Sequence, residues 1–568
     1  MILQSLCNFY HRHDITLSPY GFEHQAIPFI VVINDKGDFV EIIDTRRLKG
    51  KHKVPESFLV PQTVKKTSRV TANLLWDVSE YALGVDFKNN PEKTGSQFEA
   101  FKSRLEPYRE HSEVALLCRF LESLDEQNIT SSEHWDEIKK SNPKVSFLLE
   151  GSDSLICQSE RFTRLYIQKL GDDAGVISLP CLITGQKADI ALLHPAIKYL
   201  HGAQSSGTNI VSFNSPAFTS WSKKQGVNAP VSKKAAFEYT AALNYLLANK
   251  EYHFRIGNIT GVFWSEEQTD IGKHFREVFV DNPDSDDGAV EQAYERIQEI
   301  NANKNHAFHV LGLAPSNARI SICYWYRLSI AELQRALRLW HQDVEIVGMK
   351  TFGHPSFEWM LRCLCRGNKI KYLPDRYSTD LMGAVLTGAQ VPHTIMMAVL
   401  DKVRKYKIRV NDAHVGLLKV CLNRKYRTEG RQDMQLKVRL DEQNCQPGYV
   451  LGRLFSVFER LQEEAHRSRL SATIASRYYS GASIRPQTVF NALFQLHIHH
   501  LRKLRNPGRV NNFRKMISDL MQKIDEIPSN LSSEQQSLFA VGYYHQRQSF
   551  YSSDKDMNAD SEDSDEFE

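Results

Sequence analysis

The stretch Ile27–Asp44, IPFIVVINDKGDFVEIID, holds the clearest strand signal in the chain. Residues 29–33 form an apolar run rich in β-branched side chains, residues 35–37 (Asp-Lys-Gly) supply a turn, and residues 39–43 resume the strand pattern. This pattern is typical of a β-hairpin. The N-terminal part of the chain therefore contains a sheet, and the elements farther along decide which fold surrounds it.

Further strand patterns alternate with helical ones as far as about residue 345. Helical spacing connects Leu74, Val78, Tyr81 and Val85, and residues 235–247 have a second helical pattern. The strand patterns occupy residues 182–184, 210–213, 262–264, 309–313 and 320–325. We therefore predict a mixed α/β region over residues 1–345, with a possible sub-boundary near residue 150.

Beyond residue 345 the strand patterns stop and helical stripes take over. Four apolar stripes with short connections predict a four-helix bundle over residues 441–551. The apolar stripes lie within residues 450–461, 489–504, 513–524 and 538–543. The expected breaks between helices are Gly481, Pro486, Pro507-Gly508 and Pro528. Ser532 with Gln535 three residues later predicts the cap of the last helix. The predicted fold class is α+β, with an all-helical C-terminal bundle.

The composition is that of an ordinary globular chain. Of the 568 residues, 42% are hydrophobic and 24% are charged, which is typical of globular proteins, and this length predicts three or four domains. No apolar run approaches the roughly 20 residues that a membrane helix needs, and the N-terminus lacks the pattern of a secretory signal. Nine cysteines are scattered without a C-x-x-C pair, so we expect reduced thiols in a cytoplasmic protein.

Charge is distributed unevenly, although the net charge is only +4. Residues 552–568 carry eight acidic side chains, one lysine and few apolar residues, so we expect an acidic disordered tail. Residues 402–439 carry twelve Lys or Arg side chains against three acidic ones. They belong to a basic helical region, residues 346–440, which is either a solvated face or a surface for a polyanion.

The sequence contains none of the catalytic signatures that we sought. P-loop, dinucleotide-binding and zinc-protease motifs are missing. Residues 203–207 fall short of a hydrolase elbow, because a strand pattern follows them instead of preceding them. His11, His13 and Asp14 are possible metal ligands, but a polar helix end is the simpler interpretation. We expect no catalytic residue, no metal site and no cofactor.

Two polar segments stand out instead. KKTSRVTANLLWD, Lys65–Asp77, places cations and short hydrogen-bonding side chains before an expected helix. Either Asn73 is the N-cap of that helix, or the segment holds phosphates and Asn73 contacts minor-groove acceptors of A·T pairs. Residues 201–247 bring Gly, Ser, Asn and Gln together with Phe213, Phe218, Trp221 and several lysines. Such a loop either satisfies its own turns or closely approaches DNA.

Six segments together resemble the large subunit of the type I-C CRISPR Cascade complex. They occur in that family's order, extend over residues 1 to about 551, and leave the acidic tail outside the resemblance. They are KKTSRVTANLLWDVSEYALG (65–84), HPAIKYLHGAQSSG (194–207), VSFNSPAFTSW (211–221), QGVNAPVSKKAAFEYTAALNYLL (225–247), VLGLAPSNARISICYW (310–325) and LFAVGYYHQRQSFY (538–551).

The resemblance implies a non-catalytic DNA-binding subunit of a crRNA-guided complex. Such a subunit recognises the protospacer-adjacent motif in duplex DNA, assists R-loop formation, holds the displaced strand and docks the helicase–nuclease, while guide pairing reads the target. The implied partners are target double-stranded DNA, crRNA, the Cascade backbone and crRNA-processing subunits, and the helicase–nuclease. The family also makes a small subunit from the C-terminal region, for which an internal start near Met434 is a candidate.

The polar segments, the basic segment and the resemblance together suggest two sets of site residues. For recognition of the DNA motif we expect Lys65, Lys66, Ser68, Arg69, Thr71, Asn73, Gln204, Ser205, Ser206, Asn214 and Asn228. For the DNA backbone or the displaced strand we expect Lys223, Lys224, Lys402, Arg404, Lys405, Lys407, Arg409, Arg424, Lys425 and Arg427. Two other classes of function stay open, a metal-dependent nuclease that uses residues 11–14 and a purely structural scaffold.

Overall fold

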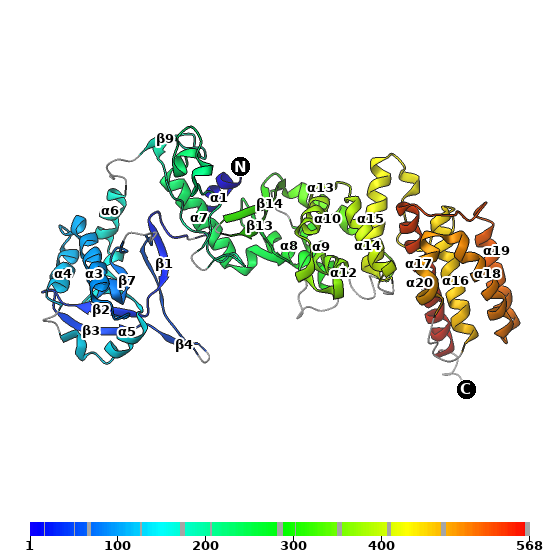
Figure 1. Ribbon diagram of the computed structural model, residues 1–568, viewed down its shortest axis with the longest axis horizontal. Helices are drawn as coiled ribbons and strands as arrows, with labels where there is room; N and C mark the ends of the chain where they lie inside the picture. Colours follow the sequence, from blue (N-terminus) through cyan, green and yellow to red (C-terminus); the bar gives the residue numbers. More distant parts are fainter. Residues whose placement is uncertain are drawn as a thin grey trace. The chain divides into compact units, whose positions relative to one another are not determined.

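The chain forms two compact units (Figure 1). Unit 1 comprises Met1–Ile197 and Asn209–Tyr245, and unit 2 comprises Lys198–Thr208 and Leu246–Glu568. The computed structural model describes all residues except 16, 50–51, 65–69, 125–127, 171–176, 205–206, 281–287, 301–302, 318, 349–354, 406–409, 467–472 and 563–568. Both units contain strands, and after β14 (Arg319–Ser329) the described elements are helical. The predicted α+β class is confirmed.

Unit 1 is built on a four-stranded sheet in the order β3-β2-β8-β7. The predicted hairpin is at its centre, because β2 (Phe29–Ile33) pairs antiparallel with β3 (Phe39–Asp44) and Gly37 takes a φ of 83° in the turn. β2 also pairs in parallel with β8 (Lys144–Leu149), and β8 pairs antiparallel with β7 (Trp76–Val78). Every residue of β2 is buried, as in a strand that is covered on both faces.

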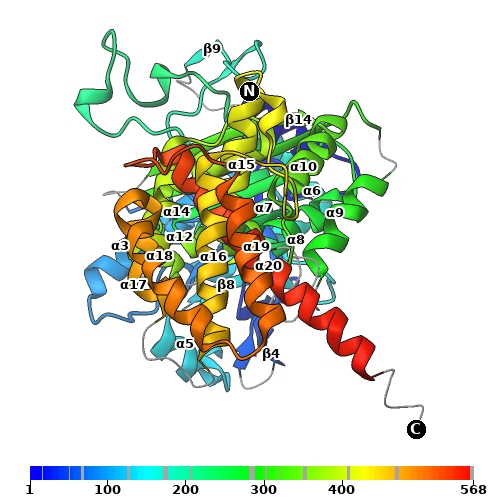
Figure 2. The ribbon, with the colours of Figure 1, turned by 90° about the vertical axis from the view of Figure 1, so that its right-hand side faces the viewer.

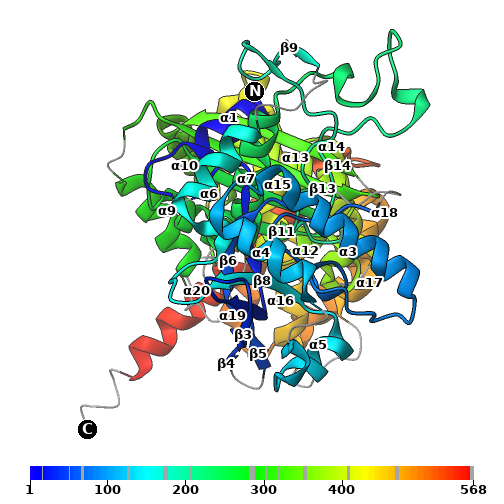
Figure 3. The same cartoon turned by 90° about the vertical axis from the view of Figure 1, so that its left-hand side faces the viewer.

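Helices and ribbons complete the core of unit 1. α3 (Pro91–Leu105), α4 (Ser112–Glu122), α5 (Trp135–Ser141) and α6 (Glu160–Lys169) share one hydrophobic core with the sheet, and Figure 3 shows α3 and α4 in front of β8. Two antiparallel ribbons belong to the same unit, β1 (Phe22–Ala26) with β6 (Ser57–Pro61) and β4 (Arg47–Lys49) with β5 (His52–Val54).

The helix predicted through Leu74 and Val85 is mostly wrong. Leu75 has a φ of 64°, which breaks a right-handed helix, and the next three residues form β7. Only α2 (Ser79–Ala82) is helical. The apolar residues do face the core, since Leu74, Leu75 and Trp76 are buried. The helical period predicted for this segment is wrong, although its prediction of buried residues is right.

The rest of unit 1 combines two helices with irregular backbone. α1 (Ile2–Tyr10) and most of α7 (Lys233–Ala248) belong to it, together with the ribbon of β9 (Ser178–Pro180) and β10 (Lys187–Asp189). The predicted strands at residues 182–184 and 210–213 are wrong. The first segment is the turn between β9 and β10, and the second is irregular.

Unit 2 begins with an antiparallel sheet in the order β11-β12-β13-β14. Its strands β11 (His253–Ile256), β12 (Ile259–Ser265) and β13 (Ala307–Ser316) precede β14, and they confirm the last three predicted strand patterns. One hydrophobic core continues from this sheet to the final helix. It therefore crosses the predicted boundaries at residues 345 and 440 without a break. The helices before the bundle are α8 (Ile271–Phe279), α9 (Ala289–Glu299), α10 (Ile330–Val344), α12 (Phe357–Leu364), α13 (Asp375–Thr387), α14 (His393–Lys405) and α15 (Asp412–Thr428).

The C-terminal bundle has five described helices where four were predicted (Figure 2). They are α16 (Pro447–Ala465), α17 (Ile474–Ile484), α18 (Pro486–Lys503), α19 (Pro507–Met521) and α20 (Ser533–Glu562). The additional one is α17, which contains the expected break Gly481. The predicted cap is confirmed, because the hydroxyl of Ser532 accepts from the Gln535 N–H at 3.3 Å. Disorder of the tail stays a prediction, since α20 continues to Glu562 and the last six residues lie outside the described chain.

Within the described ranges, no helix combines the length and the apolar character needed to cross a membrane.

Glycines let α16 and α20 approach closely. A Cβ atom on Gly452 would overlap the carbonyl oxygen of Phe539, and one on Gly542 would overlap that of Tyr449. Backbone lies against backbone at these points, so a methyl group has no flexible side chain to displace. The same two helices bury Tyr449, Phe455 and Phe539 in the core, and their close contact fixes the geometry of the bundle.

We expect Gly452→Ala to destabilise the bundle by about 1–3 kcal/mol, the usual cost of overpacking, although alanine is the better helix former. Gly95→Ala in α3 is the matched control, because a Cβ there meets nothing within 4 Å. The control should be neutral or stabilising by up to about 1 kcal/mol. Thermal unfolding followed by circular dichroism measures both variants, and equal melting temperatures would contradict this account of the crossing.

Candidate nucleic-acid interface

The loop from Asn214 to Asn228 is organised by one amide side chain. The Asn228 side-chain oxygen accepts from the Ser220 N–H at 2.9 Å, and its NH2 group donates to the carbonyl oxygens of Lys223 and Gln225, both at 2.9 Å. Asn228 therefore shapes this loop. Its amide makes these internal hydrogen bonds, and its part in recognition of the DNA motif stays a prediction.

The same loop presents exposed aromatic and cationic side chains. Trp221 is 92% exposed and Phe218 is 39% exposed, while Lys223 and Lys224 are exposed beside them. Trp221, Ser222 and Gln225 have φ values of 52°, 57° and 47°, which for a bulky residue such as Trp is a strained conformation. Strain of this kind persists where surrounding contacts enforce it, and it is commonest at functional sites.

The base of the loop is fixed by buried contacts in unit 1. Gly226 donates its N–H to the Leu192 carbonyl at 3.0 Å, and a Cβ on Gly226 would overlap the Ala191 carbonyl oxygen. Asn209 donates to the carbonyl oxygen of His194 at 3.1 Å. The ring of His194 lies 2.6 Å from the Tyr239 hydroxyl, and burial lowers the pKa of His194 to about 4, so this histidine is neutral.

The predicted motif-reading residues are distributed over both units of the chain. Gln204 is exposed and belongs to unit 2, whereas Asn214 is exposed and belongs to unit 1. The carbonyl oxygen of Gln204 accepts from the Gly207 N–H at 2.9 Å in a turn. Ser205 and Ser206 lie outside the described residues, as do Lys65, Lys66, Ser68 and Arg69.

Asn73 is buried and does not cap a helix. It is 3% exposed, its side-chain oxygen accepts from the Val64 N–H at 3.1 Å, and its own N–H donates to the Asp77 carboxylate at 2.9 Å. The N-cap interpretation is wrong, because β7 follows this residue. Direct base readout requires an exposed amide, which Asn73 lacks in this structure. Thr71, two residues earlier, is only partly buried.

We expect Asn73→Ala to lower the stability of unit 1 by about 1–3 kcal/mol, because the Val64 N–H loses its acceptor. Asn73→Asp keeps an acceptor but brings a second carboxylate beside Asp77, so it should not restore full stability. Thermal melting of each variant measures the structural role of Asn73, and a gel shift of the assembled complex measures recognition of the DNA motif. An unchanged melting curve with reduced motif discrimination would instead support readout.

The structure corrects the predictions for the basic segment. Lys402 is 5% exposed and donates to the Cys365 carbonyl oxygen, and Arg404 bonds to Gln536 at 2.9 Å and to Asp401 at 2.6 Å. Both cations serve internal acceptors. Lys405 is the last residue of α14, and its side chain lies outside the described part of the chain. Lys407 and Arg409 lie entirely outside the described residues.

Arg424 on α15 also faces inward, and its partly exposed neighbours Lys425 and Arg427 form ion pairs. Arg424 is 1% exposed, and its Nε donates to Asp343 at 2.9 Å. Arg427 donates to the other oxygen of Asp343 at 2.7 Å, while Lys425 pairs with Glu534. Burial lowers the pKa of Arg424, and the carboxylate of Asp343 opposes this shift. An arginine so buried does not reach a phosphate.

We expect Arg424→Ala to destabilise unit 2 by about 3–5 kcal/mol, because it leaves Asp343 buried with one cation fewer. The matched control is Arg335→Ala on α10, whose side chain is exposed and whose removal should change stability little. Urea unfolding compares the two. A loss of DNA binding by Arg424→Ala with unchanged stability would restore the original prediction.

A cationic surface that the sequence reasoning missed lies on α18 and α19. Residues 502–523 contain seven Lys or Arg side chains and one acid. Among the described residues, no carboxylate lies within ion-pair distance of Arg502, Arg505, Arg514 or Lys515, all of which are exposed. The net charge of this short window was the signal that could have found it.

In the possible metal site, residues 11–14, a histidine and an arginine each pair with a carboxylate. His11 lies 3.1 Å from Glu238, and Arg12 pairs with Asp14. In the part of the chain that the structure describes, no group of three or more His, Cys, Asp or Glu side chains is arranged to hold a metal ion.

Exposed cations beside aromatic side chains are typical of proteins that contact nucleic acids. The sequence model of one protein family, described as CRISPR-associated protein (Cas_Csd1), matches residues 6–551. No curated protein matches the chain. Because the family match covers nearly its whole length, the chain belongs to this family of CRISPR-associated proteins. The acidic tail lies outside the match.

Proposed function

We propose that this protein is the non-catalytic, DNA-binding large subunit of a type I-C Cascade complex. In this role it recognises the protospacer-adjacent motif in duplex DNA, assists R-loop formation and holds the displaced strand. The family membership supports a role in CRISPR defence. The observation that carries the DNA-binding part is the loop Asn214–Asn228, with its exposed Trp221, Lys223 and Lys224.

The chemistry of this loop suits a partly opened duplex. Lysine ammonium groups bind phosphates without regard to sequence, and an indole ring stacks on any unpaired base, which is worth about 1–3 kcal/mol. The hydrogen bonds of Asn228 keep the loop in one conformation before binding, so less conformational entropy is lost when DNA arrives.

The remaining partners follow from membership in such a complex. We propose crRNA, the Cascade backbone and crRNA-processing subunits, and the helicase–nuclease as partners. A small subunit beginning near Met434 would retain α16–α20. It would lack α15, whose Tyr426 hydroxyl donates to Glu534 at 3.1 Å, so this fragment would expose part of α20 unless another surface covers it.

The test is a gel shift of the assembled complex on targets with the adjacent motif or a permuted motif. We expect Trp221→Ala to weaken binding by roughly 5- to 150-fold, because the variant has no ring on which a base can stack. Lys223→Gln with Lys224→Gln should flatten the salt dependence by about 0.9 in the log–log slope for each phosphate that the loop no longer binds.

Lys139→Gln with Lys140→Gln is the matched control, because these adjacent lysines of α5 are also exposed in unit 1. Equal binding by the loop variants and the control would reject the loop as a DNA contact and favour a structural scaffold. Metal-dependent cleavage of DNA by the purified protein alone would favour the nuclease.

A further inference from the structure

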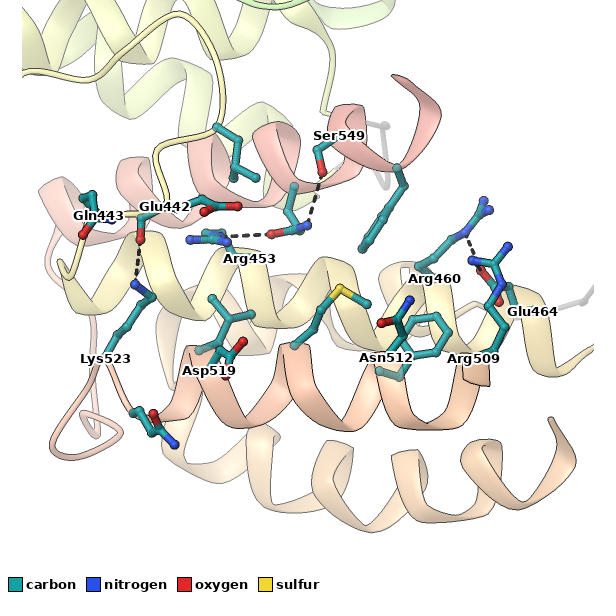
Figure 4. Close-up of a pocket in the computed structure, with 17 residues that line it drawn as sticks. Glu442, Gln443, Arg453, Arg460, Glu464, Arg509, Asn512, Asp519, Lys523 and Ser549 are labelled. Carbon is teal, nitrogen blue, oxygen red and sulfur yellow. Dashed lines mark hydrogen bonds and ion pairs between the residues drawn. The ribbon is translucent and has the colours of Figure 1, made fainter. Parts of the chain in front are cut away.

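A cavity of about 800 Å³ lies between α16, α19 and α20, and Figure 4 shows its lining. Its floor is partly apolar, with Phe513, Met516 and Phe550 among the lining residues. Its polar lining includes Arg453, Arg460, Glu442, Glu464, Asp519, Arg509 and Lys523. We call this cavity the bundle groove. It is independent of the loop Asn214–Asn228, which belongs to unit 1.

The bundle groove is lined by a buried cationic side chain, Arg453. The residue is 7% exposed, and its Nε donates to Gln546 at 3.0 Å. Its Nη1 is buried, and among the described residues it has no hydrogen-bond partner. A buried guanidinium donor without an acceptor is costly, so a carboxylate or phosphate that enters the groove gains a strong charge-assisted hydrogen bond.

The mixed lining favours a protein segment over a nucleic acid. Glu442 and Asp519 would repel a phosphate backbone that followed the whole groove. An acidic peptide can place single carboxylates opposite Arg453 and Arg509 and turn an apolar side chain onto Phe513 and Met516. The occupant should therefore combine several acidic residues with a few apolar ones.

The chain's own tail supplies many carboxylates and a few apolar side chains, Met557, Ala559 and Phe567. We propose that residues 552–568 bind in the bundle groove of the same chain. The tail has eight acidic residues and one lysine, and it ends in Glu566-Phe567-Glu568, an aromatic residue between two carboxylates. The surface beside the groove has the opposite charge, with seven Lys or Arg and one acid over residues 502–523.

The tail also begins beside the groove. Ser549 and Phe550 line the cavity, and the family match ends at residue 551. With α20 helical to Glu562, the chain moves about 18 Å beyond Phe550 at 1.5 Å per residue. Six residues span at most about 20 Å, so the chain after Glu562 is long enough to return along the helix to the level of Phe550, whose ring lies 6.0 Å from the Arg460 guanidinium.

Reaching Arg453 requires the last turns of α20 to unwind. Residues 552–562 contain three Asp, three Ser and one Asn, which favour helices weakly. These residues form the C-terminal end of α20, where the helix dipole disfavours acidic residues. Binding in the groove would replace this unfavourable arrangement with contacts to arginine, and the bound tail would shield the cationic face from other polyanions.

The test measures binding of a fluorescent synthetic peptide, residues 552–568, by polarisation. The acceptor is the full chain in which the eight tail carboxylates are replaced by amides (Asp→Asn, Glu→Gln). We expect this chain to bind the peptide at least tenfold more tightly than the wild-type chain, whose own tail occupies the groove. A peptide with Phe567→Ser keeps every charge and should bind at least threefold more weakly.

Variants of the groove locate the contact. Arg453→Gln in the amide-tail chain should weaken peptide binding at least tenfold. Arg477→Gln on α17 is the matched control, because it is exposed and does not line the groove, and it should change affinity less than twofold. If Arg453→Gln does not fold, Arg509→Gln on the exposed rim replaces it. Equal affinity of the groove variant and the control would overturn the proposal.

Crosslinking decides whether the tail binds its own chain. A zero-length carbodiimide reagent should join tail carboxylates of the wild-type chain to Lys523, which lines the groove. The yield should not change over a tenfold range of protein concentration. Crosslinks that rise with concentration, or that form only between chains, would overturn binding within one chain.

Discussion

The buried carboxylate of Asp343 organises the helical part of unit 2. Both of its oxygens accept from α15, one from Arg424 at 2.9 Å and the other from Arg427 at 2.7 Å. Lys419 adds a bond at 3.1 Å to the carbonyl oxygen of the same residue, and burial lowers the pKa of Lys419 to about 8. These contacts join the C-terminal end of α10 to the middle and C-terminal half of α15. The sheet and the bundle share one hydrophobic core.

Because of these contacts, a segment that is rich in cations in the sequence does not expose all of them on the surface. The segment with twelve Lys or Arg residues uses several of them to bind carbonyl groups and carboxylates inside the fold. Such cations hold helices together and are costly to leave unpaired. A group of exposed cations of unit 2, Arg502, Arg505, Arg514 and Lys515, lies instead on and between α18 and α19. Local composition singles out residues 402–439 because they contain more cations than residues 502–523. Only the burial of the side chains shows which of the two groups is exposed.

The two candidate binding surfaces have different physical origins. In unit 1, a strained loop without regular structure is held by the amide of Asn228 and the close backbone contact of Gly226. In unit 2, three helices leave a groove in which the buried Nη1 of Arg453 has no hydrogen-bond partner among the described residues. The loop belongs to the part of the chain that the family shares, whereas the tail proposed for the groove lies outside the family match.

The sequence by itself determined the hairpin at residues 29–44, the last three strands, the α+β class, the bundle and the family resemblance. Local turn residues and apolar periodicity carry these features. Tertiary structure decided the rest. The residues around Leu74 pack into a core as a strand and a single turn, Asn73 is buried, and Arg424 faces Asp343. Long-range contacts select the partner of a polar side chain, and no local pattern records whether that partner is solvent, DNA or another part of the chain.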